Sequence, residues 1–191
     1  PMATITLKDF TAGSYLVLAT RQGKIKKTPL EQFDRVRSTG IRAITIDDKD
    51  ELAWVDVSTG DDDVIIATAQ GKIARFHETD VRAMGRDAAG VIGIRLARAG
   101  DFVVSMSVVQ PETDLLVLTE TGYGKRVRLT EFRRKHRGGQ GVQLISLEGR
   151  NITPEMIKAV RDELRKGADQ IKIMVSGGVI AWLVEKLAIR N

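Results

Sequence analysis

The sequence has no cysteine and only two histidines, and each shortage excludes a kind of chemistry. Without cysteine the chain can form no disulfide and offers no thiolate to a metal, which is typical of the cytoplasm, where we expect the protein. His77 and His136 are too few for a histidine-based metal centre. Aromatic residues make up 5% of the chain, and no run approaches the roughly 18 apolar residues of a membrane-spanning helix. We therefore expect no membrane partner and no cofactor.

The charge balance is basic. Lys and Arg number 30 against 25 Asp and Glu, which gives a formal net charge of +5 and a pI near 9.6. Such an excess favours a polyanionic partner only where the cations cluster, since a modest excess is often no more than a solvated surface. With 191 residues, 42% of them hydrophobic, the chain is long enough to bury an ordinary core.

A repeated unit of about 50 residues fills most of the chain. An apolar run followed by a glycine turn occurs three times, in steps of 71 − 23 = 48 and 122 − 71 = 51 residues, and a second set of glycines repeats in steps of 90 − 40 = 50 and 141 − 90 = 51 residues. Two landmarks with one period indicate a single supersecondary unit used three times. The first glycines are Gly23, Gly71 and Gly122, and the second are Gly40, Gly90 and Gly141.

The segments within each unit have the short, β-branched composition of strands. In the first unit we expect strands at residues 15–20, 23–28, 43–46 and 52–57. Four strands per repeat of this length predict a mainly β fold of three four-stranded, propeller-type blades. We divide the chain into a leading segment with an edge strand (1–13), the three-blade region (14–150) and an αβ tail (151–191).

Cations recur after the first glycine turn of each unit, along the expected second strand and the long polar connection that follows it. The acidic residues gather in other turns, so each unit is electrically polarised. A basic stripe formed by equivalent positions of successive repeats is the pattern expected for binding a nucleic-acid backbone; the alternative is that these charges only occupy solvent-facing strand positions. The predicted DNA-binding cations are Lys24, Lys26, Lys27, Arg35, Arg37, Lys72, Arg75, Arg82, Arg86, Lys125, Arg126, Arg128, Arg133, Arg134, Lys135 and Arg137.

Glycines accompany the densest cations, in the stretch Arg137-Gly138-Gly139-Gln140-Gly141. Glycine lets a backbone approach a phosphate closely, and successive amides in such a loop can form an anion-binding concavity, so we add Gly138 and Gly139 to the predicted site. A plain glycine-rich turn before the next strand is the alternative. The scarcity of aromatic residues favours duplex backbone binding over single-strand stacking.

The chain resembles the C-terminal DNA-wrapping domain of the DNA gyrase A subunit over roughly residues 14–148. The resemblance implies a propeller-like fold that wraps duplex DNA around a basic rim. That family has six blades, so the chain looks like about half of the disc, without the cleavage tyrosine or ATPase parts, and we expect no catalysis by it alone. The motifs that carry the resemblance are Gly23-Lys24-Ile25-Lys26-Lys27-Thr28, Leu30-Glu31-Gln32-Phe33, Asp50-Glu51-Leu52, Val81-Arg82-Ala83-Met84-Gly85-Arg86, Gly93-Ile94-Arg95-Leu96 and Gly122-Tyr123-Gly124-Lys125-Arg126.

The stretch Arg137–Gly141 is similar to the glycine-arginine box of that family, but it departs from the family's pattern. The box normally lies in the first blade, and it carries a further cation where Gln140 stands here. We therefore interpret this copy as degenerate.

The tail after Arg150 breaks the repeat. Thr153 and Pro154 are typical of a helix start. Residues 171–175 are typical of a buried strand, and residues 179–189 are typical of a short helix or strand. The stretch 167–179 also resembles one barrel strand of metal-dependent amidohydrolases, in which a lysine at the place of Lys172 bridges metals. Because the chain offers no paired histidines, packing is the favoured role. A blade region joined to such a tail suggests a recombined or engineered chain.

Three blades leave two open ends, a liability that proteins cover or pair. Either the tail and the strand at residues 5–7 cover these ends, or two copies form a homodimer whose blades close a ring. Three functions stay open: a duplex DNA-binding module without sequence preference, a chimeric structural or folding-model protein with no retained activity, and an amidohydrolase-like enzyme.

Overall fold

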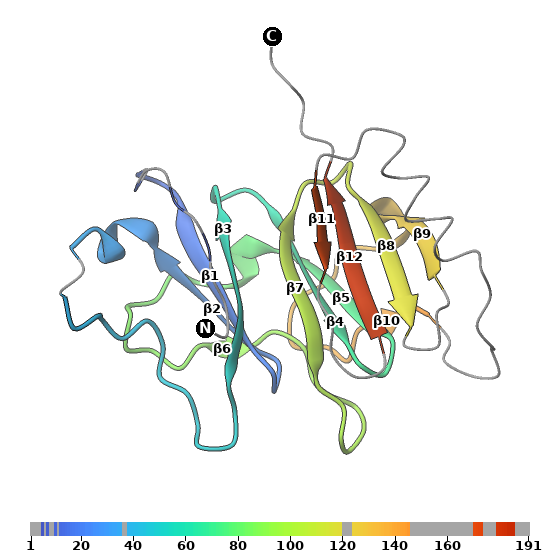
Figure 1. The fold of residues 1–191 in the computed structure, drawn as a ribbon, viewed down its shortest axis with the longest axis horizontal. Coiled ribbons are helices and arrows are strands. Elements are labelled where there is room, and N and C mark those ends of the chain that lie inside the picture. Colours follow the sequence, from blue (N-terminus) through green and yellow to red (C-terminus); the bar gives the residue numbers. More distant parts are fainter. Residues whose placement is uncertain are drawn as a thin grey trace, which may run out of the picture.

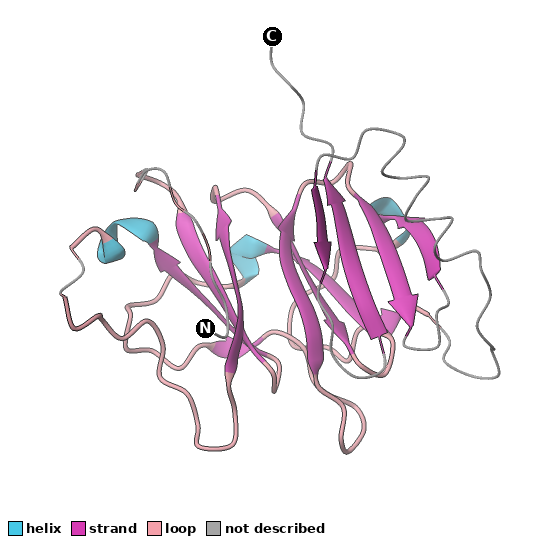
Figure 2. Ribbon diagram, viewed as in Figure 1, coloured by secondary structure: helices cyan, strands magenta, loops and turns pink. Residues whose placement is uncertain are grey.

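Three four-stranded antiparallel sheets stand in a row in the computed structural model (Figure 1). The structure describes residues 5, 7, 10, 12–35, 38–119, 124–145, 170–173 and 179–185. Strands dominate these residues, and the helices among them are short (Figure 2). The strands are β1 (Tyr15–Thr20), β2 (Lys24–Pro29), β3 (Leu52–Ser58), β4 (Asp63–Thr68), β5 (Lys72–His77), β6 (Val91–Ile92), β7 (Val103–Val109), β8 (Asp114–Thr119), β9 (Gly124–Arg128), β10 (Val142–Gln143), β11 (Gln170–Ile173) and β12 (Val179–Glu185), and the 3-10 helices are η1 (Leu30–Phe33), η2 (Glu78–Asp80) and η3 (Leu129–Glu131).

The sheets confirm the predicted blade architecture and most of the predicted strands. Blade one has the strand order β3-β1-β2-β6, and blade two has the equivalent order β7-β4-β5-β10. Each blade centres on a hairpin that turns at the first glycine of its unit, Gly23 or Gly71, where φ is positive. Positive φ is costly for residues with a side chain, so glycine at these two positions permits the tight turn.

The outermost strand of a blade comes from the following unit. β6 of unit two pairs with β2 of blade one, and β10 of unit three pairs with β5 of blade two. Gly90, which precedes β6, lies so close to blade one that an added Cβ would stand 2.6 Å from the carbonyl oxygen of Ile25. Gly141 stands in the same relation to Ile73, also at 2.6 Å. Successive blades are therefore linked by exchanged strands.

This exchange corrects one expected strand. Residues 43–46 form no strand, although Ile44 is buried as its equivalents Ile94 and Ile145 are. The equivalent residues 93–96 and 144–145 form no strand either, because the exchanged strands β6 and β10 lie earlier in the repeat, at the positions of residues 41–42. Unit one has no preceding blade in the described structure with which residues 41–42 could pair. Gly40 keeps the φ of +78° that the docked glycines have, with no atom within 4 Å of an added Cβ.

Blade three is completed by the tail. β12 pairs with β8 at the place that β3 and β7 take in the other blades, and β11 pairs with β12. Of the strand expected at residues 171–175, residues 171–173 are described and form a strand. Of the element expected at 179–189, left open as helix or strand and counted as a helix in the αβ tail, the described residues 179–185 form a strand. The helix expected from Thr153 lies outside the described residues. β9 is the equivalent of β2 and β5, each of which pairs with an exchanged strand. Among the described residues, β9 pairs only with β8.

The apolar core lies between the blades and follows the two-residue period of the strands. On β4, Val64 and Ile66 face blade one, whereas Ile65 and Ala67 face blade three. The exchanged segments add Ile94 to the first junction and Ile145 to the second. Blade two is therefore buried on both faces, which explains the continuous apolar run of β4 in the sequence.

The outer face of blade one is covered by its own chain. Leu16, Leu18 and Ile44 are buried there, and the expected cover by the leading segment is present, because Ile5 and Leu7 pack against this cluster, although not as a strand. No helix in the described part of the chain is long and apolar enough to cross a membrane.

Candidate nucleic-acid interface

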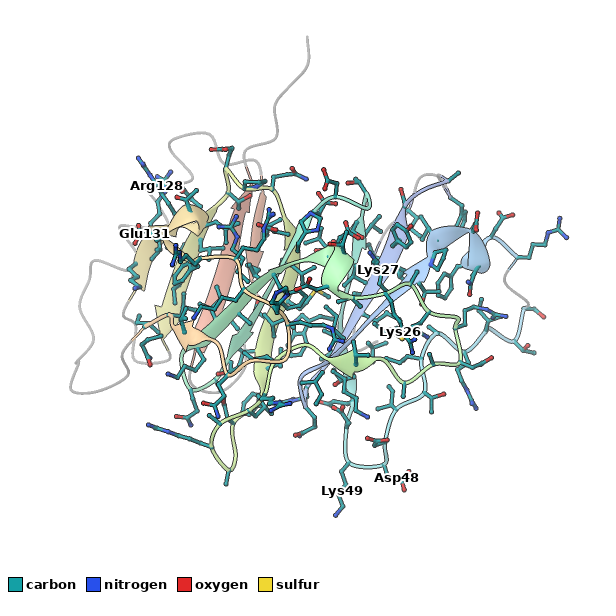
Figure 3. All side chains as sticks on the ribbon, turned by 180° about the vertical axis from the view of Figure 1, so that it is seen from behind. Lys26, Lys27, Asp48, Lys49, Arg128 and Glu131 are labelled. Atoms are coloured by element: carbon teal, nitrogen blue, oxygen red, sulfur yellow. The ribbon has the colours of Figure 1, made fainter. Side chains whose placement is uncertain are left out.

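The predicted cations fall into two groups, one buried and one at the surface. Lys26 belongs to the first, because it is fully buried and its Nζ donates hydrogen bonds to the carbonyl oxygens of Ala43, at 2.7 Å, and Arg86. Burial lowers the pKa of Lys26; the negative charge of Asp87 opposes this shift and the positive charge of Arg86 adds to it. Figure 3 shows Lys26 among the strands rather than at the rim. Its side chain cannot contact DNA in this conformation.

Lys27 and Arg75 occupy equivalent positions on β2 and β5; Lys27 is buried, and the side chain of Arg75 is nearly so, with 9% exposed. Lys27 Nζ lies 3.1 Å from the carbonyl oxygen of Glu78 and 3.2 Å from its carboxylate Oε2. Arg75 donates to the carbonyl oxygens of Leu129, at 2.8 Å, and Phe132, at 3.1 Å. In each case a cation on one blade reaches the 3-10 helix of the next unit. These two residues join blades and do not present charge to a ligand.

Arg126 is the third member of this series, on β9. It pairs with Asp114, as Arg75 pairs with Asp63 one blade earlier. Its side chain is 46% exposed, whereas that of Arg75 is 9% exposed. The same register position is thus structural in blade two and accessible in blade three.

The remaining predicted cations lie at or near the surface. Lys24 is half-buried and makes an ion pair of 2.6 Å with Asp47, so an acidic turn partly neutralises the first blade's rim and the charge separation expected within each unit is incomplete there. Arg37 lies outside the described residues. The exposed cations are Arg35, Arg82, Lys125, Arg126, Arg128, Arg133, Arg134 and Lys135, and the partly exposed ones are Lys24, Lys72, Arg86 and Arg137.

The densest group of surface cations is the cationic segment, Arg133–Arg137, between η3 and β10. It lies on blade two: the Lys135 amide donates to the Arg75 carbonyl oxygen at 2.9 Å, and Arg134 Nε lies 2.8 Å from Asp63. Arg128 ends β9, at the blade-three end of the molecule (Figure 3). Cations from unit three are therefore fixed against the rim of blade two.

The glycine-rich stretch continues this path onto blade one. Arg137 donates from Nε to the Asp80 carbonyl oxygen and from a terminal guanidinium nitrogen to the Ile92 carbonyl oxygen, both at 2.9 Å. The Gly138 amide donates to Gly93 at 2.7 Å, and the Gly139 carbonyl accepts from the Arg95 amide at 2.8 Å. One chain segment thus spans the rims of two blades, and because the Gly138 amide already has a protein acceptor, the turn interpretation accounts for that residue.

Two kinds of residue were missed by the sequence reasoning. Arg95 is exposed beside the glycine-rich stretch but was not among the predicted cations. Asp63 and Asp80 anchor Arg134 and Arg137 but were given no role in the predicted site. One feature of the sequence could have identified the structural cations. Lys27, Arg75 and Arg126 stand at the same position of the repeat, which indicates a shared structural role.

Comparison with known proteins identifies the family. Residues 14–59, 62–110 and 113–151 each match the family described as DNA gyrase C-terminal domain, beta-propeller. The chain belongs to this family. The three matched segments coincide with the three units of the repeat, so the resemblance drawn from the motifs is confirmed.

Gyrase A subunits from distant bacteria are similar over almost the whole chain. The subunit of Klebsiella oxytoca is 40% identical and that of Staphylococcus epidermidis 39% identical, over 93% and 94% of this chain and 20% of each relative. The chain thus spans about a fifth of the length of these relatives. The family match ends at residue 151, so the similarity to the gyrase subunits extends well into the tail, which counts against an unrelated origin for it.

Solved domains of this family have the same fold. The structure of a DNA gyrase A C-terminal domain superposes with a TM-score of 0.65 at 31% identity, over 73% of this chain and 46% of that one. The C-terminal domain of DNA topoisomerase IV gives a TM-score of 0.67 at 30% identity, over 73% and 43%. In both cases the match covers less than half of the solved domain. Among the described residues no group of three metal-ligating side chains is present. Most of the stretch 167–179, on which the amidohydrolase resemblance rests, lies outside the described residues.

Proposed function

We propose that the chain is a non-catalytic module that binds duplex DNA through its exposed rim cations, without reading base sequence. The observation that carries this proposal is the cationic segment, whose side chains from Arg133 to His136 are exposed although its backbone is anchored on blade two. Membership of the gyrase C-terminal domain family supports the same partner.

The chemistry of the rim suits a phosphate backbone. Arg and Lys neutralise phosphates and release condensed counterions, so binding through them weakens steeply as salt is added. Arg137 and the glycine-rich stretch extend the cations from blade two onto blade one, along which a duplex would lie. Side chains that contact only phosphates fix the position of DNA but carry no sequence information.

The proposed contact set is narrower than the predicted one. Lys26 and Lys27 are buried among protein acceptors and Arg75 is nearly so, and we leave them out. The contact cations are the exposed and partly exposed members named above, with Arg95 added. Since the match covers less than half of a solved domain, we expect binding with a lower salt slope than a complete domain shows, and little bending.

The experiment that tests this proposal is a fluorescence-anisotropy titration of a short duplex at several salt concentrations. Arg133→Gln with Lys135→Gln removes two exposed charges of the cationic segment. We expect binding about tenfold weaker and a salt slope smaller by about two. The matched control is Lys49→Gln with Arg98→Gln, which removes two exposed charges outside the proposed set; Lys49 lies at the tip of a projecting loop, away from Arg128 (Figure 3).

The competing function is a chimeric structural or folding-model protein without retained activity. Duplex binding that is absent at low salt, or that falls equally in both double variants, would favour this alternative. The homodimer stays a prediction. Light-scattering mass with and without duplex tests it, and the burial of Leu16 and Ile44 within the single chain argues against an exposed apolar end on blade one.

A further inference from the structure

A buried ion pair lies directly beneath the cationic segment. The Asp63 carboxylate is fully buried and accepts from Arg75 at 2.7 Å through Nε and at 2.6 Å through a terminal nitrogen. The same carboxylate lies 2.8 Å from Nε of Arg134, whose side chain is 50% exposed. One negative charge is therefore shared by two guanidinium groups, one inside the protein and one at the surface.

Arg75 is tied to the same stretch of chain at three further points. Its guanidinium donates to the carbonyl oxygens of Leu129 and Phe132, on both sides of η3. Its own carbonyl oxygen accepts from the Lys135 amide at 2.9 Å. The segment that carries the densest charge is thus attached to blade two on either side of Arg133.

We propose that Arg75 and Asp63 are positioning residues that hold the cationic segment in its DNA-binding conformation while touching no DNA themselves. This inference rests on the proposed function. An ordered segment binds more tightly than a mobile one with the same charges, because the entropy of ordering it has been lost before binding. The pair therefore affects affinity and leaves the number of phosphate contacts unchanged.

The first junction shows what the pair adds. Lys27 occupies the position equivalent to Arg75. The carbonyl oxygen of Lys27 accepts a hydrogen bond from the Met84 amide, just as the carbonyl oxygen of Arg75 accepts one from the Lys135 amide. Its side chain, however, contacts Glu78 alone in the following unit. A planar guanidinium carries its donors on three nitrogens in a fixed fork, so it can reach the carboxylate and both carbonyls at once, whereas the three donors of an ammonium all start from one nitrogen.

The test uses Arg75→Lys, which keeps the charge but loses the fork of donors, and Asp63→Asn as a second, isosteric variant. The matched control is Lys27→Met with Glu78→Leu, which alters the equivalent buried pair at the other junction. In the described structure neither residue hydrogen-bonds to residues 129–135, whereas Arg137 is held by Asp80 in the same 3-10 helix as Glu78, so the control and the test variants are compared over residues 129–135. Each protein is measured well below its thermal transition, by hydrogen exchange of residues 129–137 and by duplex titration at several salt concentrations.

For Arg75→Lys and Asp63→Asn we expect exchange in residues 129–137 to become about tenfold faster and duplex binding to become about tenfold weaker. The salt slope of Arg75→Lys should equal that of the wild type, since its charge count is unchanged. The control should keep wild-type exchange in residues 129–135 and lose less affinity than either test variant, although its melting temperature falls.

Two results would overturn the inference: wild-type exchange and affinity in a folded Arg75→Lys protein, or an equal loss of affinity in the control. A wild-type chain that binds no duplex would instead remove the proposed function. In that case the exchange data alone decide whether Arg75 and Asp63 order the segment.

Discussion

The two junctions between blades use the same repeat positions but take their negative charge from different places. At the first, the buried Lys27 is neutralised by Glu78, which belongs to the next unit. At the second, the nearly buried Arg75 is neutralised by Asp63 on its own blade and reaches the next unit only through carbonyl oxygens. The first junction is therefore an ion pair between blades, and the second is an ion pair within a blade that donates hydrogen bonds to its neighbour.

The substitutions that distinguish the junctions are correlated. Tyr15 stands on β1 where Asp63 stands on β4, and Lys27 Nζ lies 4.6 Å from the centre of the Tyr15 ring. Glu78 in turn stands where the other units have buried leucines, Leu30 and Leu129. The two junction cations, Lys27 and Arg75, each keep one carboxylate, because an uncompensated charge in the interior is strongly unfavourable. The position that supplies this carboxylate is free to change.

The first junction depends most on Glu78, so its removal should have the largest effect. The Glu78 carboxylate also accepts from Ser58 at 2.7 Å and from the amides of Gly60 and Asp62, both at 2.9 Å. We expect Glu78→Ala to lower the free energy of unfolding by about 4 kcal/mol, because Lys27 and three further donors lose their acceptor. Urea unfolding followed by circular dichroism measures this loss.

Leu129→Ala is the comparison at the second junction, where the same position contributes packing alone. Its expected cost is about 3 kcal/mol. A cost for Glu78→Ala smaller than that for Leu129→Ala would show that the first junction does not depend on its carboxylate.

A double-mutant cycle separates the ion pair from its surroundings. Lys27→Met should destabilise the fold because it leaves the Glu78 carboxylate charged and buried without its partner. Glu78→Leu should destabilise it because it leaves the Lys27 ammonium charged and buried without its partner. Combining them removes both charges, and we expect the pair to lose about 2 kcal/mol less than the sum of the single losses. Unfolding curves of the four proteins give this coupling energy, and strictly additive losses would contradict an ion pair between the blades.

Substitutions at two equivalent glycines test the contribution of the exchanged strand, which is present beside Gly90 and, in the part of the chain that the structure describes, absent beside Gly40. Gly90 and Gly40 both have positive φ, but only Gly90 lies against a neighbouring carbonyl, that of Ile25. We expect Gly90→Ala to cost about 3 kcal/mol, from strained φ and from displacement of blade-one backbone. Gly40→Ala should cost about 1 kcal/mol, from φ alone. Equal melting temperatures of the two variants would mean that the exchanged strand contributes little.

The repeat and the family were predictable because they depend on local patterns. Apolar runs followed by Gly23 and Gly71 indicate hairpins, and the positions of the second glycines establish one period. The exchanged strands were not predictable in this way. β6 and β10 are two residues long, too short to show any periodicity, and their partners belong to the preceding unit.

The buried cations also escaped sequence analysis, for a related reason. Lys26 and Lys27 follow one another on β2, as expected of a strand with a solvent-facing side, yet both are buried. The acceptors of Lys26 lie at Ala43 and Arg86, 17 and 60 residues further along the chain. Whether a lysine is a surface charge or an internal donor thus depends on contacts that appear only when the blades pack.

Lys26 supplies the smallest expected effect, a dependence of stability on pH. Burial holds the pKa of Lys26 in the folded protein below its ordinary value of 10.5. Between the folded pKa and 10.5 the unfolded chain therefore binds a proton that the folded chain has released, and the free energy of unfolding rises with pH across this window.

Lys26→Met removes this titration, so we expect wild-type stability to rise relative to the variant as the pH approaches 10.5. Urea unfolding of both proteins at a series of alkaline pH values measures the difference, and NMR titration of the Lys26 side chain reports its pKa directly. Parallel stability curves would show that the two carbonyl acceptors stabilise the ammonium as well as water does. In that case Lys26 would stay charged in the folded protein and would link residues 43 and 86 through hydrogen bonds, as Lys27 and Arg75 link successive blades.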